Sequence, residues 1–296
     1  MNINYEYYKI FYYAAKYKNI TRAAAAMGSS QPNVTRVLKL LEAELGCKLF
    51  VREARGIALT EEGKRLYTHV QIAVMQLENA QEELSAQASD EMGIVEIGVT
   101  ETALHLFLLD VLRSFKEGHP RVRIKIHNDT TPRLLKKLAC GSLDFAVLTT
   151  PFAQQRFVSA ELASFREILV GGSQYRELGK KQYKLSELKG YPWVGLLEGT
   201  ATSVFYREFF LKHHTDMELD MEAATSDLLI PLIQNNFGIG FVPEKMAQPF
   251  ISKQELVQIP LSCSLPKRDI CLVSDKERGK SIVSARLQTY LKEAAG

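Results

Sequence analysis

The segment from Thr21 to Leu45, TRAAAAMGSSQPNVTRVLKLLEAEL, restricts the possible folds more than any other part of this 296-residue chain. Its first part contains four consecutive alanines, so a helix here presents only methyl groups and can lie very close to a neighbouring helix. Gly28 tolerates the left-handed backbone of a tight helix stop, and Pro32 suits the first turn of a following helix, where its missing N–H is not needed. With Thr21 as the expected cap of the first helix, the segment predicts two helices joined by a short turn.

Apolar residues at helical spacing precede and follow this turn. Before it, one helix face is formed by Tyr8, Phe11, Tyr12 and Ala15. After it, one stripe is formed by Val34, Val37, Leu38 and Leu41. The order of a helix, a small-residue helix, a short turn and an amphipathic helix is that of a helix-turn-helix, and it predicts a DNA-binding module.

The polar side of the last helix is the expected DNA-reading surface. Gln31, Asn33 and Arg36 carry side chains that can form paired hydrogen bonds with base edges. Thr35 and Lys39 suit phosphates instead. Each of these residues taken alone is equally consistent with a solvated helix face, and it is the predicted turn geometry and the local charge that favour DNA.

The charge of the chain is unevenly distributed. Residues 1–60 contain nine basic and four acidic side chains, a net charge of +5, whereas the whole chain carries only +3. The remaining residues therefore sum to −2. A basic head on a nearly neutral body predicts a polyanionic partner for the head alone.

A β-hairpin is expected directly after the helix-turn-helix. Two β-prone runs, residues 48–51 and 57–60, flank a turn that ends in Gly56. Arg52 and Arg55 then stand where they can reach phosphates or a narrow minor groove. This hairpin is interpreted as the wing of a winged helix-turn-helix.

The run from Asn19 to Gly63 resembles the signature of LysR-type transcriptional regulators. That signature has a TRAA helix, then SQP-x-x-[ST]-R, LE-x-x-LG, LF followed by R, and LT-x-x-G. The matching residues are Thr21, Arg22, Ala23, Ala24, Ser30, Gln31, Pro32, Thr35, Arg36, Leu41, Glu42, Leu45, Gly46, Leu49, Phe50, Arg52, Leu59, Thr60 and Gly63.

The resemblance implies a winged helix-turn-helix in residues 1–60 and a regulator rather than an enzyme. The expected DNA contacts are Thr21, Arg22, Ser30, Gln31, Pro32, Asn33, Thr35, Arg36, Lys39, Arg52 and Arg55. The implied partners are double-stranded promoter DNA at a partly palindromic site and RNA polymerase.

A long linker helix is expected within residues 61–92, from Thr60 as its cap to about Ser89. Its apolar residues repeat at spacings of four and three, a heptad seam, formed by Leu66, Val70, Ala73, Leu77, Ala80 and Leu84. About two and a half heptads are fewer than a coiled coil usually needs, so the alternative is a helix that lies against its own domain. The polar opposite side favours pairing with a second chain, and the resemblance implies a homodimer that doubles to a homotetramer.

From Gly93 onward the pattern changes to alternating strands and helices, which begin as βαβαβ. Two α/β lobes are expected within residues 93–296: lobe 1 from about 93–150 and 268–296, and lobe 2 from about 162–257. The fragments FKEGHPRV, LLKKLACGSLDFAVL and IQNNFGIGFVPEKMA resemble the effector domain of the same family, which is related to type 2 periplasmic binding proteins. The overall fold class is therefore multidomain α/β.

Four polar loops at expected strand ends and helix N-termini are candidates for contact with a small molecule between the lobes. Their Thr and Ser residues are equally able to cap helices. The resemblance assigns effector contacts to Thr100, Thr102, Thr131, Thr200 and Thr202. Glu101 stands among them where the family has a small neutral residue, so its carboxylate favours an effector with an amino group, such as an amino acid, over a small carboxylate.

Two rival interpretations remain open. The first is a redox-sensing regulator that uses Cys263 and Cys271, although the four cysteines lack CxxC spacing, which favours reduced thiols. The second is a solute-binding or enzymatic α/β protein with an incidental DNA-binding head. Against it, the chain lacks the motifs of common catalytic sites, and neither a cofactor nor a metal is expected.

No segment approaches the roughly 18 consecutive apolar residues of a membrane helix. The N-terminus MNINYEYYKIFYY also lacks the features of a signal peptide. We therefore expect a cytoplasmic protein that is not attached to a membrane.

Overall fold

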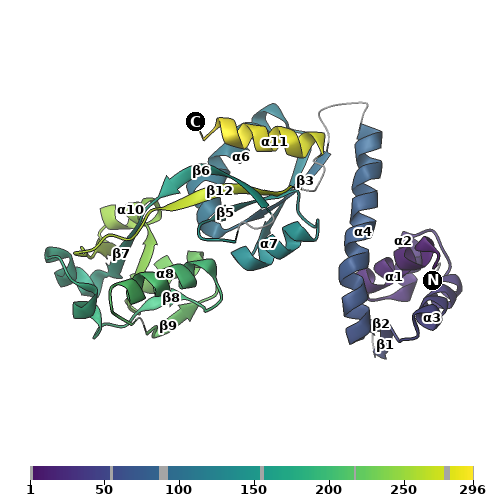
Figure 1. The fold of residues 1–296 in the computed structure, drawn as a ribbon, viewed down its shortest axis with the longest axis horizontal. Coiled ribbons are helices and arrows are strands. Elements are labelled where there is room, and N and C mark those ends of the chain that lie inside the picture. The colour runs from purple at the N-terminus through teal and green to yellow at the C-terminus, as the bar shows by residue number, and fades with distance from the viewer. Residues whose placement is uncertain are drawn as a thin grey trace. The chain divides into compact units, whose positions relative to one another are not determined.

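The computed structural model describes residues 3–53, 56–86, 93–153, 157–216, 218–276 and 281–295. The chain forms two compact units, the first of residues 1–87 and the second of most of residues 88–296. Figure 1 shows their helices and strands, with the first unit in purple and blue.

The first unit is a winged helix-turn-helix followed by a long helix. Its elements are α1 (Tyr5–Tyr17), α2 (Ile20–Ala26), α3 (Gln31–Leu45), β1 (Phe50–Glu53), β2 (Gly56–Leu59) and α4 (Glu61–Ala86). The predicted apolar stripes meet in one core, in which Phe11, Val34 and Leu41 are fully buried. Ala23 and Ala24 also lie in this core, which confirms the close helix contact that the alanine run predicts.

The turn between α2 and α3 forms as the sequence predicts, but α2 has a different cap. Gly28 adopts a left-handed φ of 61°, and Ser30 caps α3 by accepting a hydrogen bond from the Asn33 amide at 3.4 Å. The cap of α2 is Asn19, whose Oδ1 accepts from the Arg22 amide at 3.0 Å. The assignment of Thr21 as the cap is therefore wrong, because the helix begins one residue before it.

The wing is an antiparallel pair of β1 and β2 in which Phe50 lies opposite Leu59. Thr60 caps α4, because its Oγ1 accepts from the Gly63 amide at 2.9 Å and donates to the Lys48 carbonyl at 2.7 Å. Both bonds fix the start of the long helix on the wing. The expected helix end at Ser89 lies outside the described residues.

The first part of the predicted heptad seam packs within its own unit. Val70 is 6 % exposed and joins the core of the first unit together with Val74, and Leu66 packs against the same core. This corrects the assignment of Val70 to a dimer contact. Val70 and Val74, four residues apart on α4, form a second apolar stripe that packs in the same core as α1, so Val70 is buried within its own chain. Ala73 is exposed, as is Leu77 at 47 %.

The second unit contains a five-stranded sheet in lobe 1. Its order is β4-β3-β5-β12-β6, with β3 (Gly93–Val99), β4 (Val122–Asn128), β5 (Phe145–Thr149), β6 (Phe157–Phe165) and β12 (Arg268–Asp275). The first three strands are parallel, and β12 runs antiparallel to both β5 and β6. The predicted βαβαβ order is thus observed.

Helices cover both faces of this sheet (Figure 1). They are α5 (Glu101–Ala103), the π-helical η1 (Leu104–Leu108), α6 (Leu109–Gly118), α7 (Thr131–Ala139) and α11 (Ile282–Glu293). Phe145 and Val147 of β5 pack with α6 and α11, while Ala146 and Leu148 pack with α7. Because neighbouring strand residues point to opposite faces, a strand covered on both sides needs the unbroken apolar run FAVL.

Lobe 2 is built around β7 (Glu167–Gly172), which lies between β10 (Ile239–Pro243) and β11 (Leu256–Gln258). A parallel pair, β8 (Val194–Leu196) and β9 (Met221–Ala223), adjoins this sheet through a bridge between Trp193 and Ile239. The helices are α8 (Ala201–Lys212), α9 (Leu229–Gln234), α10 (Glu244–Ser252) and the short 3-10 segments η2 (Ser173–Lys180), η3 (Leu185–Leu188) and η4 (Ser226–Leu228).

One lobe boundary differs from the expected one. Strand β6 pairs with β12 along its length, so the lobe 1 sheet extends to Phe165 and the chain enters lobe 2 only at Glu167. The expected start of lobe 2 near residue 162 is therefore a few residues too early.

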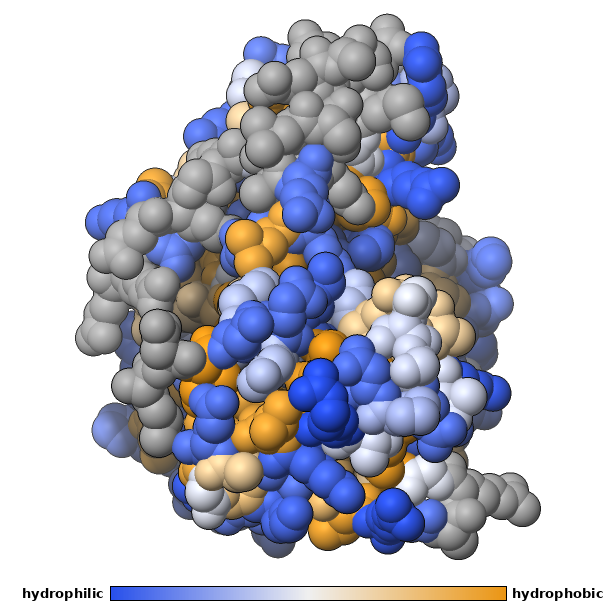
Figure 2. All heavy atoms as spheres, turned by 90° about the vertical axis from the view of Figure 1, so that its right-hand side faces the viewer, coloured by the Kyte–Doolittle hydropathy of each residue, from blue (hydrophilic) through white to orange (hydrophobic). Residues whose placement is uncertain are grey.

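The surface in Figure 2 is mainly hydrophilic, with apolar side chains interspersed. Among the described residues, no helix is both long and apolar enough to cross a membrane.

Candidate DNA-binding face and inter-lobe site

Helix α3 separates its apolar and polar residues cleanly. Val34 and Leu41 are completely buried. On the other side the exposed residues are Ser30 at the cap and Gln31, Pro32, Arg36 and Lys39 in the helix, with Asn33 and Thr35 half-buried. The predicted base-reading and phosphate-binding side chains therefore share one surface.

Two of the predicted base-reading residues hold each other in place. Arg36 Nη2 donates to Asn33 Oδ1 at 3.1 Å, and Asn33 Nδ2 donates to Ser29 Oγ at 3.1 Å. Thr35 Oγ1 donates to the Gln31 carbonyl at 3.0 Å, which leaves its oxygen able to accept. The guanidinium of Arg36 thus projects from a fixed position with further N–H groups available, as paired bonding to a base or a phosphate requires.

The other predicted DNA contacts lie on α2 and the wing. Thr21 and Arg22 are exposed on α2, and Arg52 is exposed on β1. Arg55 lies outside the described residues.

Glu42 links α3 to the wing, a role that the sequence did not reveal. Its Oε1 accepts from the amides of Leu49 at 2.8 Å and Phe50 at 3.3 Å, while Oε2 pairs with Lys48 Nζ at 2.7 Å. Burial alone raises the pKa of this carboxyl, but the bonds from Lys48 and from the two amides outweigh burial, so the pKa lies below its usual value. The signals in the sequence are its place in the LE-x-x-LG part of the family signature and a carboxylate beside the apolar stripe of a basic segment.

The predicted effector residues belong to both lobes. Thr100 and Thr131 follow the parallel strands β3 and β4, and Thr102 lies in α5; Thr102 and Thr131 are buried. Thr200 and Thr202 belong to the first turn of α8 in lobe 2. Helix α5, which contains half-buried Glu101, contacts η4 of lobe 2, so the two lobes meet here.

These threonines do not have equal hydrogen bonding. Thr200 is a helix cap, since its Oγ1 accepts from the Ser203 amide at 3.0 Å. Thr100 Oγ1 is buried without a partner. Thr202 Oγ1 accepts a hydrogen bond from Arg268 Nη2 at 3.0 Å. The sequence did not predict Arg268 as a site residue.

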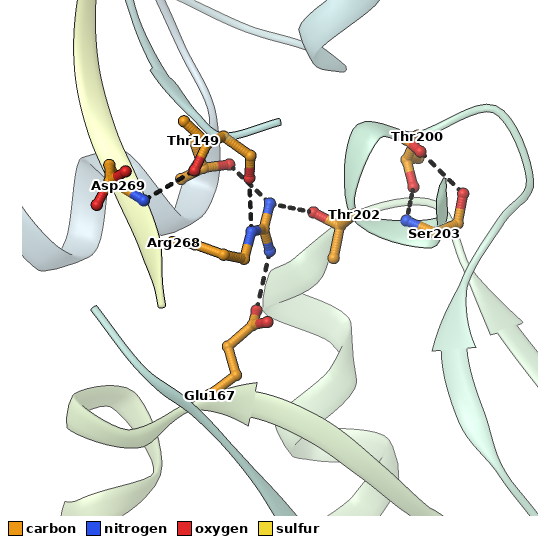
Figure 3. A network of polar contacts seen from close by, with 8 residues as sticks. Thr149, Glu167, Thr200, Thr202, Ser203, Arg268 and Asp269 are labelled. Atoms are coloured by element: carbon orange, nitrogen blue, oxygen red, sulfur yellow. Dashed lines mark hydrogen bonds and ion pairs between the residues drawn. The ribbon is translucent and has the colours of Figure 1, made fainter. Parts of the chain in front are cut away.

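Arg268 is the centre of a polar network between the lobes (Figure 3). Its guanidinium donates to the Thr150 carbonyl at 2.6 Å, Thr149 Oγ1 at 3.2 Å, Glu167 Oε1 at 3.0 Å and Thr202 Oγ1. The side chains of Arg268 and Glu167 are 2 % and 4 % exposed. An arginine two residues before the apolar run ICLV is the signal that could have indicated this site.

The carboxylate of Glu167 also affects its surroundings. Burial, and after it the charge of Glu167, raises the pKa of Tyr206 well above its usual value. The second oxygen of this carboxylate, Glu167 Oε2, is buried and has no hydrogen-bond partner among the described residues. The network is therefore a tightly enclosed polar cluster.

The two cysteines of the redox hypothesis lie in environments that disfavour a thiolate. Cys263 packs at the lobe 2 core, whereas Cys271 is buried in β12 of lobe 1. Burial raises the pKa of Cys263, and burial together with Asp269 and Glu161 raises the pKa of Cys271 to about 11. Because the thiolate is the reactive form, this pair is poorly suited to rapid oxidation.

Two cavities lie away from the predicted effector residues. One of about 410 Å³ is lined by Asp110, Val111, Ser114, Tyr290, Glu293 and Ala294. Another of about 200 Å³ is lined by Ser164, Phe165, Arg166, Glu244, Lys245 and Lys267. None of the six predicted effector residues lines either cavity.

Family comparisons agree with this architecture. Residues 6–64 match the bacterial regulatory helix-turn-helix protein model of the lysR family, and residues 88–296 match the LysR substrate binding domain. The chain belongs to the LysR family of transcriptional regulators, as the sequence signature predicts.

Individual relatives span nearly the whole chain. The uncharacterized HTH-type transcriptional regulator YybE of Bacillus subtilis is 22 % identical over 289 residues, 98 % of each chain. YwbI of the same organism, likewise an uncharacterized HTH-type transcriptional regulator, is 27 % identical over 278 residues, 90 % of this chain and 89 % of its own. The crystal structure of full-length CbnR complexed with its target DNA has a TM-score of 0.75 at 19 % identity, covering 99 % of this chain and 100 % of CbnR. This likeness confirms the predicted fold class.

Proposed function

We propose that this LysR-type regulator binds promoter DNA sequence-specifically through α3 and its wing, and that a small-molecule effector acts on the two-lobed unit. The observation that carries the DNA-binding part is the division of α3: one face is buried in the core, and the other presents Gln31, Arg36 and Lys39 to the solvent. CbnR, which has a similar fold, has been solved on its target DNA.

In this proposal Gln31, Asn33 and Arg36 read bases, whereas Lys39 and Arg52 bind phosphates. Arg36 suits a guanine edge because a guanidinium can donate two parallel bonds to O6 and N7. Thr21, Arg22, Ser30, Pro32, Thr35 and Arg55 complete the proposed DNA contacts. Phosphate contacts position the protein, and base contacts supply the sequence preference.

The effector is proposed to be an amino acid or a small carboxylate held between the lobes. Thr100, Glu101, Thr102 and Thr131 supply the lobe 1 contacts, and Thr200 and Thr202 supply those from the N-terminus of α8. That helix end has free N–H groups and a partial positive charge, which suit a carboxylate. Such a ligand regulates DNA binding only if it prefers one of two arrangements of the protein.

The active form is proposed to be a homodimer that doubles to a homotetramer and contacts RNA polymerase. Exposed Ala73 and Leu77 on α4 support pairing through this helix, whereas Val70 serves its own core. A two-fold pair of DNA-binding heads reads a partly palindromic site.

The test is footprinting on the DNA that flanks the gene for this protein, across a salt series, with and without a panel of amino acids and small carboxylates. We expect a protected, partly palindromic site whose affinity falls steeply as salt rises, because phosphate contacts release counterions. A footprint that shifts with one compound identifies the effector. Diffuse protection that is independent of sequence would contradict base reading by α3.

A further inference from the structure

Arg268 is an unusual residue for its position. It begins β12, an interior strand of the lobe 1 sheet that lies between β5 and β6, and it is among the largest fully buried side chains. Removing a guanidinium from water is costly unless its charge and its N–H groups are all compensated. The surroundings of Arg268 therefore have to resemble a binding site for a guanidinium ion.

The hydrogen-bond acceptors around Arg268 come from both lobes. Thr149 Oγ1 and the Thr150 carbonyl belong to lobe 1, at the end of β5. Glu167 Oε1 and Thr202 Oγ1 belong to lobe 2, at the starts of β7 and α8. Figure 3 shows Thr149, Glu167 and Thr202 around the guanidinium of Arg268, so a single side chain joins the two lobes.

Two aromatic rings complete the enclosure. The Cζ of Arg268 lies 5.4 Å from the centre of the Phe165 ring and 5.0 Å from that of Phe205. Phe165 ends β6 in lobe 1, while Phe205 belongs to α8 in lobe 2. Aromatic faces attract cations, and a planar guanidinium stacks on them better than an ammonium does.

These six residues, called the guanidinium cage below, are Thr149, Thr150, Phe165, Glu167, Thr202 and Phe205. A separate ligand between two lobes stabilises their closed arrangement by a free energy that grows with the logarithm of its concentration. In this protein the ligand group is attached to the chain, so its local concentration is high and fixed.

We propose that Arg268 is a built-in ligand of the inter-lobe cleft: it occupies a cage selective for a guanidinium group and holds the two lobes closed without an external effector. An effector that reaches Thr202 then has to displace one bond of this internal ligand rather than fill an open cleft. The proposal uses neither DNA nor an effector, so its failure is distinguishable from a failure of the proposed function.

The first test is chemical rescue of the full-length Arg268→Ala variant. The variant is expected to melt about 6–20 °C below the parent, because Glu167 loses its buried partner. Methylguanidinium chloride at about ten times its dissociation constant is then expected to raise the melting temperature of the variant by about 3–5 °C. Methylammonium chloride at the same ionic strength is expected to have no such effect.

Two controls accompany the rescue. The parent protein is expected not to respond to methylguanidinium, because Arg268 fills the cage. Arg113→Ala removes the same charge from an exposed position, and it is expected neither to lower the melting temperature appreciably nor to respond. An Arg268→Ala variant as stable as the parent, or one stabilised equally by both cations, would overturn the proposal.

A second test applies even if Arg268→Ala does not fold. Thr202→Val keeps the side-chain size but removes one lobe 2 acceptor. We expect hydrogen exchange at residues 163–168 and 266–270, where the chain crosses between the lobes, to accelerate about fivefold to tenfold. Thr131→Val, a buried lobe 1 substitution outside the cage, is the matched control. Exchange at the parental rate in Thr202→Val would contradict the inference.

Discussion

Replacing Glu42 with alanine is expected to detach the wing from α3. The carboxylate accepts hydrogen bonds from the amides of Leu49 and Phe50, which lead into β1, and pairs with Lys48. No other acceptor for these two amides lies on α3. The substitution therefore leaves two N–H groups without their partner, one of them beside the fully buried side chain of Leu49.

The magnitude follows from the kind of bond that is lost. A hydrogen bond to a charged acceptor contributes about 1.5–3 kcal/mol, and an amide left buried without a partner costs a similar amount. The ion pair adds little, since the Lys48 side chain is 76 % exposed and water screens it. We expect Glu42→Ala to lower the free energy of unfolding by about 2–4 kcal/mol, and Glu42→Gln, which retains an oxygen acceptor, by about half as much.

The pH dependence of this contribution has a definite sign. The pKa of Glu42 is lower in the folded protein than in the unfolded chain, where it is about 4.3. Its stabilising effect is therefore complete above the unfolded pKa and is lost as the pH falls through the folded pKa. The stability difference between the parent and Glu42→Gln should be constant near neutral pH and shrink below about pH 4.

Urea unfolding of the full-length protein measures these differences, and DNA affinity measured on the same samples shows whether the wing is displaced. The control is Glu44→Gln, which changes an exposed carboxylate on the same helix. If Glu42→Ala and Glu44→Gln unfold at the same urea concentration, Glu42 does not anchor the wing.

Further predictions concern backbone packing and the thiols. Gly63→Ala should lower the free energy of unfolding by about 1–3 kcal/mol, because its Cβ would lie 2.2 Å from the Leu49 carbonyl oxygen. Gly118→Ala at the end of α6, where a Cβ would meet nothing within 4 Å, should instead raise it by up to about 1 kcal/mol, since alanine favours a helix more than glycine does. Calorimetry of both variants measures these changes. Replacing Cys263 and Cys271 together with alanine should leave DNA affinity in the presence of hydrogen peroxide unchanged, and a lost peroxide response would restore the redox hypothesis.

The sequence predicts the helix-turn-helix well because its determinants are local. Gly28 and Pro32 specify the turn through their own backbone preferences, and the apolar spacing selects the buried faces. The cap of α2 was misassigned by two residues, since Asn19 and Thr21 are both good caps and only the tertiary position of the helix selects between them.

For the long apolar stripe of α4, the sequence does not decide whether its own domain or a second chain buries it. The residues of α4 satisfy two periodicities at once, a heptad seam and a stripe through Val70 and Val74 that faces α1. Periodicity shows that a face is apolar, but it does not identify the partner that buries it. The expected start of lobe 2 near residue 162 was too early for a related reason: as an edge strand, β6 is only partly buried, and its alternation is weak.

The inter-lobe site was predictable only in part. The threonines at strand and helix ends follow from the α/β pattern and the family resemblance, but Arg268 finds its partners at long range. Glu167 is 101 residues away in the sequence and Thr149 is 119. No local pattern indicates whether such an arginine faces solvent or the space between two lobes.

The most direct test of the central claim is the effect of Arg36→Ala on specific and non-specific DNA affinity. On the footprinted site, the loss of a paired base contact should weaken binding by about 1–3 kcal/mol, whereas binding to random DNA should weaken much less. Arg113→Ala, which removes the same charge from an exposed position in the second unit, should leave the ratio of the two affinities unchanged. If Arg36→Ala also leaves that ratio unchanged, α3 does not read bases through Arg36, and sequence-specific binding of this regulator through that residue is refuted.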